Sequence, residues 1–336
     1  MSLVFAGVCS HAPGITGRAH MADREIAEEF YRAYRGMGEE LAAAKPDVLV
    51  IVAAEHFANF FMNNMPVFAM GMAGGYEGPI EDPQWLGIPR VRIPGNAPLA
   101  LRLIRDMMQT VDVAYAEEWK FDHGVMVPLS FLTPHYDLPV IPVNINCQGP
   151  PLTPLHRAWA LGKALRRAAD LAPERIALVG TGGISHWPAT PDSGKINEAW
   201  DREFLRRWLA NDKAAMLSYT DELTYRDAGQ GGFEIRTFIS IAAAAGGQGR
   251  LQHYRPIPNF AVGCTVATMN EAHVPLVELA GGNPTLADHD ASEVAGIAAD
   301  PQIGVTHRGL IAFEQLQQAL ATGDQQPGEP RINRES

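Results

Sequence analysis

The stretch IALVGTGGISH, residues 176–186, begins as an apolar run and continues into a glycine-rich turn. An apolar run without alternation is typical of a strand that helices cover on both faces of a sheet. Similar strand-like runs occupy residues 3–8, 48–54, 140–145 and 260–268. Helical stretches are predicted between them, at about 22–44, 97–110, 153–171, 197–217 and 234–246. The alternation predicts an α/β fold, with a central, mostly buried sheet flanked by helices on both faces.

His186 closes this stretch and follows three glycines, Gly180, Gly182 and Gly183. Glycine has no Cβ, so backbone at this turn can approach a ligand closely. His186 is therefore a candidate functional residue, and its role depends on what the rest of the chain brings to the same place.

The strand-like runs all lie within the first 275 residues, so we expect one large domain over 1–275. A small helical C-terminal extension is predicted over 276–322, where it would serve as a lid or as an oligomerisation element. The polar tail, 323–336, is predicted to be disordered. Within the large domain, the segment 61–95 is rich in Gly, Pro and Met and is predicted to form a short hairpin or a long loop.

The composition bounds the possible partners and compartment. The 336 residues carry a formal net charge of −11 without a basic stripe, which argues against nucleic acid or a membrane surface as a partner. No apolar run approaches a membrane span, and the N-terminus does not resemble a signal peptide. The three scattered cysteines indicate reduced thiols. We expect a cytoplasmic protein that forms a homo-oligomer, a dimer or larger.

Four histidines lie at or near the ends of predicted strands. His11, His56 and His186 follow three of the strand-like runs, and His123 lies in the segment KFDHGVMVPL. A lone histidine beside a turn is more often a structural residue than a ligand or a base. In an open α/β sheet, however, ligands bind outside the carboxyl ends of the strands, and this arrangement would gather at least three of the imidazoles.

A carboxylate beside two of these imidazoles would complete a metal site. Two histidines and one carboxylate on one face suit non-heme Fe(II), and three protein ligands also suit catalytic zinc. Glu55 and Asp122 directly precede histidines, so they are predicted to point to the opposite face. Glu234 follows a glycine-rich turn that could present it into a pocket, but it could equally be an ordinary acidic residue at a helix N-terminus.

Several motifs, taken together, resemble the class III extradiol ring-cleavage dioxygenases. This superfamily includes the catalytic subunit of protocatechuate 4,5-dioxygenase, gallate dioxygenase and 2,3-dihydroxyphenylpropionate 1,2-dioxygenase. The resemblance covers roughly residues 3–270. The motifs are SHAP at 10–13, EHFANFFMNNMPVFAMG at 55–71, DHGVMVPL at 122–129, GTGGISH at 180–186, FEIRTF at 233–238 and HYRPIPNFAVG at 253–263.

The resemblance implies a role for each of five residues. His11, His56 and Glu234 would bind Fe(II). His186 would be the catalytic acid and base, and His123 would be a second active-site histidine that contacts the substrate or oxygen and can donate a proton.

The resemblance also implies the reaction, which is ring cleavage of a small catecholic, carboxylated substrate with insertion of both atoms of O2. Tyr254 and Pro256 would belong to the pocket wall. Arg236 and Arg255 are candidate partners for the substrate carboxylate. The alternative function is a zinc-dependent metallohydrolase that uses the same two histidines and glutamate, with a metal-bound water as nucleophile.

Overall fold

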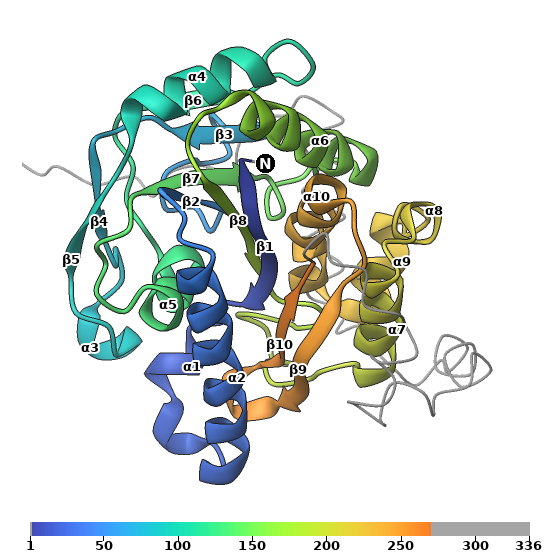
Figure 1. Cartoon of the computed structure of the whole chain (residues 1–336). Helices are drawn as coiled ribbons and strands as arrows, with labels where there is room; N and C mark the ends of the chain where they lie inside the picture. Colours follow the sequence, from blue (N-terminus) through green and yellow to red (C-terminus); the bar gives the residue numbers. More distant parts are fainter. Residues whose placement is uncertain (1, 270–336) are drawn as a thin grey trace, which may run out of the picture. The chain divides into compact units, whose positions relative to one another are not determined.

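The computed structural model describes residues 2–269, which form a mixed eight-stranded sheet with helices on both faces (Figure 1). The strand order is β6-β3-β7-β2-β8-β1-β10-β9. The four central strands, β7, β2, β8 and β1, are parallel, and antiparallel pairings join them to β3 and to β10. The strands are β1 Leu3–Ser10, β2 Val48–Ala54, β3 Phe68–Gly71, β6 Ala114–Ala116, β7 Val140–Ile145, β8 Ile176–Gly182, β9 Arg250–Ile257 and β10 Val262–Thr268. The predicted α/β class is confirmed.

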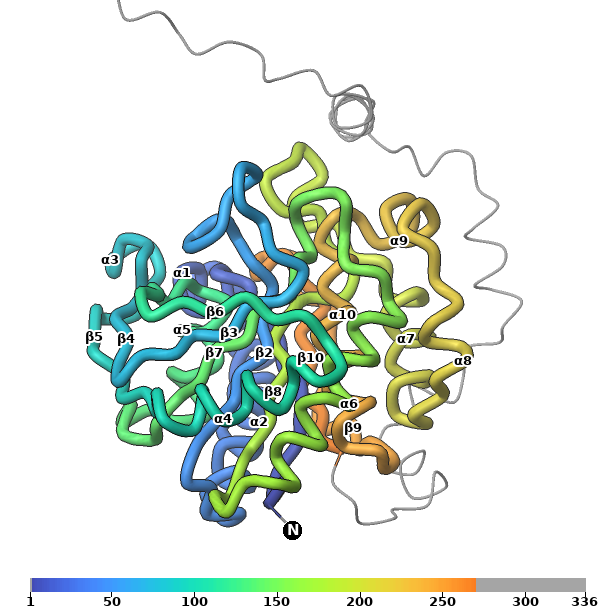
Figure 2. Tube along the Cα trace, turned by 90° about the horizontal axis from the view of Figure 1, so that it is seen from above, coloured from blue at the N-terminus to red at the C-terminus, as the bar shows by residue number. Residues whose placement is uncertain are grey.

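The helices form a layer on each face of the sheet, as Figures 1 and 2 show from two directions. One layer contains α2 and α5, which pack on β10 and on β2 and β8, and the other contains α4, α6 and α10. The long helices are α2 Arg24–Ala43, α4 Ala97–Met107, α5 His123–Leu132, α6 Leu155–Leu171, α7 Glu198–Leu209, α9 Asp221–Ala228 and α10 Ile235–Ala245. Short helical segments are α1 Gly14–Gly17, α3 Pro83–Leu86, α8 Lys213–Met216, η1 Ala19–Met21, η2 Gln230–Glu234 and η3 Pro258–Phe260.

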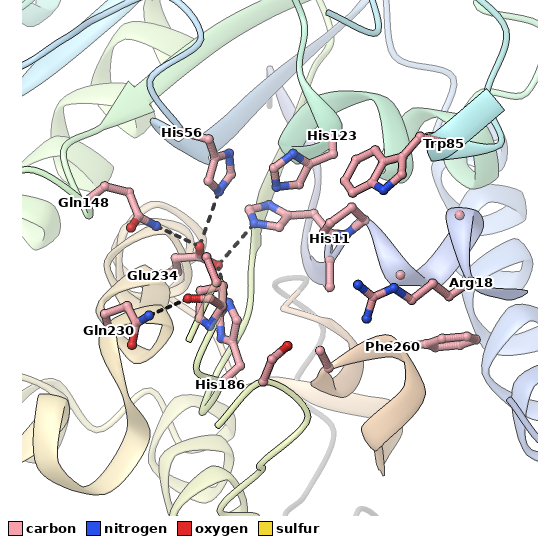
Figure 3. Close-up of a pocket in the computed structure, with 18 of the residues that line it drawn as sticks. His11, Arg18, His56, Trp85, His123, Gln148, His186, Gln230, Glu234 and Phe260 are labelled. Atoms are coloured by element: carbon pink, nitrogen blue, oxygen red, sulfur yellow. Dashed lines mark hydrogen bonds and ion pairs between the residues drawn. The ribbon is translucent and has the colours of Figure 1, made fainter. Parts of the chain in front are cut away.

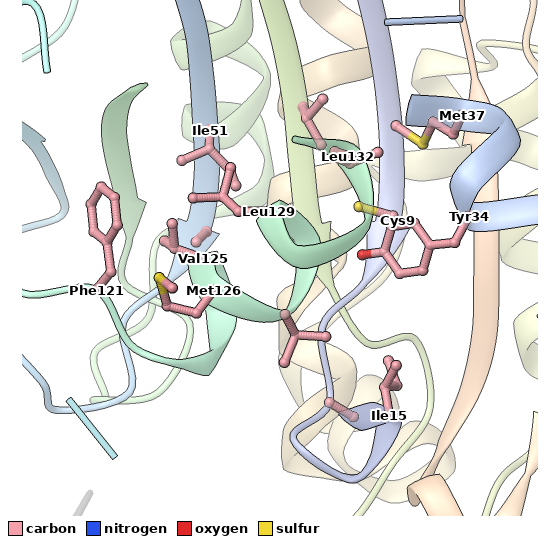
Figure 4. Close-up of a cluster of buried hydrophobic side chains, with 14 of the residues drawn as sticks. Cys9, Ile15, Tyr34, Met37, Ile51, Phe121, Val125, Met126, Leu129 and Leu132 are labelled. Carbon is pink, nitrogen blue, oxygen red and sulfur yellow. The ribbon is translucent and has the colours of Figure 1, made fainter. Parts of the chain in front are cut away.

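Helix α2 illustrates why the sequence folds in this way. The side chain of Asp23 accepts hydrogen bonds from two backbone N–H groups in the first turn and so caps the helix. Phe30, Tyr34, Met37 and Leu41 recur on one face and are fully buried or nearly so. In Figure 4, Met37 and Tyr34 lie beside Cys9 of β1, in the core between the sheet and this layer.

The parallel register aligns the carboxyl ends of the central strands. Cys9 lies opposite Thr181, and Ser10 lies opposite Gly182, so β1 and β8 end side by side. Strand β2 pairs with the other edge of β8. Whatever follows these three strands therefore emerges at one edge of the sheet.

The structure departs from the predicted elements at several places. The helix predicted over 197–217 is two helices, α7 and α8, because the chain turns at Asn211, which has a φ of 50°. Helix α10 begins after the separate turn η2, and β10 begins after η3. Strand β9 and helix α5 were not predicted, because neither has a clear apolar period. The segment 61–95 contains β3 and an antiparallel pair, β4 Gly75–Gly78 and β5 Val91–Pro94.

The predicted boundary at 275, the helical extension over 276–322 and the tail over 323–336 lie outside the described residues. Within residues 2–269, no helix combines the length and apolarity that crossing a membrane requires.

Candidate active site

Five side chains that the sequence singled out line one cavity of about 500 Å³ (Figure 3). They are His11, His56, His123, His186 and Glu234. His11 directly follows β1, His56 lies two residues after the end of β2, and His186 follows β8. His123 is instead the first residue of α5, and Glu234 is the last residue of η2. The topology thus gathers imidazoles from three adjacent strands, as predicted.

The hydrogen bonds of His11 determine its tautomer. Its Nδ1 lies 3.1 Å from Oγ1 of Thr181, and this hydroxyl donates its single proton to the carbonyl of Gly124 at 2.7 Å. Oγ1 must therefore accept a hydrogen bond from Nδ1–H. The Nε2 lone pair is then free, and it lies 3.2 Å from Oε2 of Glu234. Burial lowers the pKa of His11 to about 4 despite the opposing effect of Glu234, so the ring is neutral at pH 7.

His56 is oriented in a similar way by a carboxylate. Its Nδ1 lies 3.0 Å from Oδ2 of Asp122, and its Nε2 lies 3.4 Å from Oε1 of Glu234. Burial raises the pKa of Asp122, but the neighbouring histidines, His56 first and then His123 and His11, together lower that pKa to about 2. Burial also lowers the pKa of His56, but the two carboxylates hold it well above its usual value. The space between His56 and Glu234 therefore favours positive charge.

Glu234 is buried and faces both Nε2 atoms. Its Oε1 accepts a hydrogen bond from the side chain of Gln148 at 3.2 Å, and its Oε2 accepts one from the backbone N–H of Gly183. Burial raises the pKa of Glu234, but the histidines around it, mainly His11 and His186, hold that pKa well below its usual value. An ionised carboxylate and two imidazole nitrogens thus converge, and this donor set suits a metal cation.

His123 lies beside these groups and is held by Glu81. One carboxylate oxygen of Glu81 accepts hydrogen bonds from Nδ1 of His123 at 2.6 Å and from its backbone N–H at 2.9 Å. The ring centroid of His123 is 4.2 Å from that of His56. Nitrogen atoms of His11, His56 and His123 all lie within 4.8 Å of one another, so these three imidazoles also form a group able to hold a metal.

His186 lies on the opposite side of Glu234 from His56 in Figure 3. Its Nδ1 donates to the carbonyl of Ile184 at 3.3 Å, which leaves the Nε2 lone pair free to accept a proton. Nε2 is 3.8 Å from Oε2 of Glu234. The ring lies against the backbone of Gly183 and Gly231, where any Cβ would collide with it. These two glycines, one in the turn after β8 and one in η2, therefore make the space that the imidazole occupies.

Sequence reasoning missed the residues that orient the histidines. Asp122 and Glu55 are absent from the cavity lining, as expected of residues that face away. Asp122 nevertheless acts on the site through the far nitrogen of His56, and Glu55 accepts hydrogen bonds from the backbone of residues 58–60. An aspartate before HGVMVPL is a helix N-cap signal that could have indicated α5. Nothing in the sequence around Glu81 indicates its contact with His123.

Tyr254 and Pro256 do not line the cavity. Tyr254 is buried, and its hydroxyl donates to Oδ2 of Asp201 at 2.7 Å. Oδ1 of Asp201 accepts the backbone N–H of Ser185 at 2.7 Å. Tyr254 therefore stabilises the turn that carries His186 indirectly, through Asp201, and does not contact the cavity.

Neither arginine suggested for a substrate carboxylate is placed to bind one. Arg236 is buried, and its guanidinium bonds Asp221 and the carbonyl of Thr153. Arg255 is exposed and pairs with Glu29 at 3.0 Å, away from the cavity. The suggestion was wrong because the sequence alone cannot show which cations have partners.

Comparison with known proteins identifies the class. Residues 6–265 match the family described as the catalytic LigB subunit of aromatic ring-opening dioxygenase. The chain belongs to this family, the class III extradiol dioxygenases, and is a ring-cleaving dioxygenase. This membership decides against the zinc metallohydrolase as the class of enzyme.

Individual relatives agree with the family assignment. The chain is 30% identical to a 2,3-dihydroxyphenylpropionate/2,3-dihydroxicinnamic acid 1,2-dioxygenase of Cupriavidus necator, over 73% of this chain and 91% of the relative. It is 29% identical to the enzyme of the same name from Paraburkholderia xenovorans, over 76% and 91%. A crystal structure of an uncharacterized protein from Escherichia coli K12 shares the fold, with a TM-score of 0.51 at 18% identity, and covers 70% of this chain and 91% of that one.

Proposed function

We propose that the protein is an Fe(II)-dependent extradiol dioxygenase that cleaves the ring of a carboxylated catechol. One observation carries the proposal: the Nε2 atoms of His11 and His56 each lie within 3.4 Å of an oxygen of the Glu234 carboxylate. Both imidazoles have Nδ1 engaged, so both Nε2 atoms are directed at the carboxylate oxygens in a buried place. Such an arrangement is costly unless positive charge lies among these atoms.

The distances fit a single ion. Two ligand atoms that each lie about 2.1 Å from an ion are about 3.0 Å apart at a right angle and about 3.4 Å apart at a tetrahedral angle. The separations here are 3.2 Å from Nε2 of His11 to Oε2 of Glu234 and 3.4 Å from Nε2 of His56 to Oε1, the other oxygen of the same carboxylate. Fe(II), when bound, supplies the redox activity that couples a catechol to dioxygen, which zinc with its filled d shell cannot supply.

His186 is the proposed proton acceptor. Its neutral tautomer presents Nε2 to the cavity, where it can take a proton from a catechol hydroxyl and later return it to the opening ring. His123 presents its other nitrogen, because Nδ1 is bonded to Glu81. We assign His123 to contact with the substrate or oxygen and to proton donation.

The substrate class rests on chemistry and on relatives. Two relatives carry names that state action on 2,3-dihydroxyphenylpropionate, which bears a carboxylate on a short side chain. A cavity of about 500 Å³ is in the range that holds a ligand of this size. We further propose a cytoplasmic location, which suits three free, buried cysteines, and a homo-oligomeric assembly.

Oxygen uptake by the reconstituted enzyme tests the proposal. The protein is loaded anaerobically with Fe(II) and offered protocatechuate, gallate, 3-O-methylgallate, 2,3-dihydroxyphenylpropionate and unsubstituted catechol. We expect uptake matched to a coloured ring-fission product with at least one carboxylated catechol, and none from zinc-loaded protein. An iron-loaded enzyme that consumes no oxygen with the whole panel would contradict the proposal.

A further inference from the structure

Arg18 supplies the one Lys or Arg side chain among the described residues that line the cavity. It is exposed, and its guanidinium has no hydrogen bond or ion pair within residues 2–269. In Figure 3 it extends into the cavity on the side of Trp85 and Phe260. An arginine that lines a pocket and has no partner there is available to an anionic ligand.

The backbone that carries Arg18 is fixed on two sides. A Cβ on Gly14 would lie 2.9 Å from backbone atoms of Phe260, and one on Gly17 would collide with the carbonyl of Trp85. Helix α1 is therefore wedged between α3 and η3, and only glycine permits both approaches. Arg18 directly follows α1, so its Cα is held between the two aromatic residues although its side chain is exposed.

The charges in the cavity are separated. Glu234 is the sole carboxylate among the lining residues of the described chain, and it lies with Gln148 and Gln230 across the cavity from Arg18 (Figure 3). The histidine and glutamate end accounts for the catechol oxygens under the proposed function. The opposite end of the cavity, where the Arg18 guanidinium lies, has no role in that chemistry. A ligand with two hydroxyls at one end and a carboxylate at the other would satisfy both ends.

We propose that Arg18 binds the carboxylate of the substrate's side chain and so sets the preference for anionic over neutral catechols. The proposal rests on the proposed function, because it places the catechol at the histidines. The planar guanidinium can donate two parallel hydrogen bonds to one carboxylate, and the exposed faces of Trp85 and Phe57 border the same cavity. Arg18 thus takes the role that the sequence suggested for Arg236 or Arg255.

Kinetics with two substrates that are alike in shape but differ in charge test the assignment. The Fe(II)-loaded full chain, Arg18→Gln and the control Arg32→Gln are compared on 2,3-dihydroxyphenylpropionate and on its methyl ester. Arg32 is an exposed arginine of α2 that does not line the cavity. We expect Arg18→Gln to lower kcat/KM for the acid about tenfold or more, mainly through KM, and to change the ester less than about twofold.

Two outcomes of these assays would overturn the proposal. One is an Arg18→Gln enzyme that matches Arg32→Gln on the acid. The other is an equal loss on the acid and on the ester, because that result would indicate a general disturbance of the pocket and not a lost charge contact.

A binding experiment separates this proposal from the proposed function. Anaerobic titration calorimetry measures the binding affinity of two ligands. One is 3-phenylpropionate, which has the carboxylate but no catechol, and the other is 3-phenylpropionamide, its neutral counterpart. We expect the wild type and Arg32→Gln to bind the acid more tightly than the amide, and Arg18→Gln to lose that difference. If no catechol is cleaved, the proposed function fails, and calorimetry alone then tests whether Arg18 binds a carboxylate. A wild type without preference for the acid would then refute the role of Arg18.

Discussion

Asp122 and His56 are joined by a 3.0 Å hydrogen bond between the carboxylate and Nδ1, and the same carboxylate caps helix α5. One side chain therefore orients a proposed metal ligand and begins the helix whose first residue is His123. Such outer partners of ligating histidines set the tautomer and the ring orientation.

Replacing Asp122 with Asn is expected to weaken iron binding about 10- to 100-fold. Asparagine caps a helix nearly as well as aspartate, so α5 should persist. The amide, however, provides no negative charge for the Nδ1–H of His56. The measurement is an Fe(II) titration followed by a competing chelator, with circular dichroism as the check on folding.

The matched control for this variant is Asp23→Asn, which changes the N-cap of α2 in the same way. It should leave iron affinity unchanged. Equal iron affinity in the Asp122 and Asp23 variants would show that the hydrogen bond to His56 does not act on the metal site.

Glu234→Gln is expected to lose most of its iron while remaining folded. The amide keeps the shape of the side chain but removes the charge that faces His11 and His56. Iron content after desalting, measured per chain, checks this. A variant with the wild-type iron content would direct attention to the three-histidine group, in which His123 would be the third ligand.

Gly231→Ala is expected to retain iron and to lose turnover. The added methyl would collide with the imidazole of His186 and displace the proposed base. The loss should approach that of His186→Ala, which we expect to be about 10²- to 10⁴-fold in kcat. Gly36→Ala, where nothing lies within 4 Å of an added Cβ, is the control and should keep full activity. Normal turnover by Gly231→Ala would argue against His186 as the base.

Asp201 is expected to make stability depend on pH. Burial raises the pKa of Asp201 to about 7, despite its hydrogen bonds from Ser185 and Tyr254. In the unfolded chain the pKa is about 3.9. The folded state therefore binds the proton more tightly, and the stability present below about pH 4 is lost as the pH rises to about 7.

Urea unfolding of the wild type and of Asp201→Asn between pH 5 and pH 8 measures this effect. The asparagine does not titrate, so the difference in unfolding free energy isolates Asp201. The wild type should lose stability relative to the variant as the pH rises, by up to about 1.4 kcal/mol per pH unit, and the difference should level off above about pH 7. A difference that stays constant with pH would mean that Asp201 is ionised throughout.

The sequence by itself determined the fold class and placed three histidines of the cavity at one edge of the sheet. The apolar runs could be recognised as buried strands because helices cover both faces of the sheet, and this coverage is a local property of each run. The carboxyl ends of parallel strands share one edge, so placing His11, His56 and His186 together required only the chain order.

Tertiary structure alone decided which other groups act on these residues. Glu81 reaches His123 from 42 residues away, and Thr181 sets the tautomer of His11 across 170 residues. The tertiary structure also decides that Arg236 is paired with Asp221, whereas Arg18 lines the cavity without a partner among residues 2–269. Local sequence specifies the period and burial of an element, whereas hydrogen bonds and ion pairs between distant segments arise only once the chain has packed.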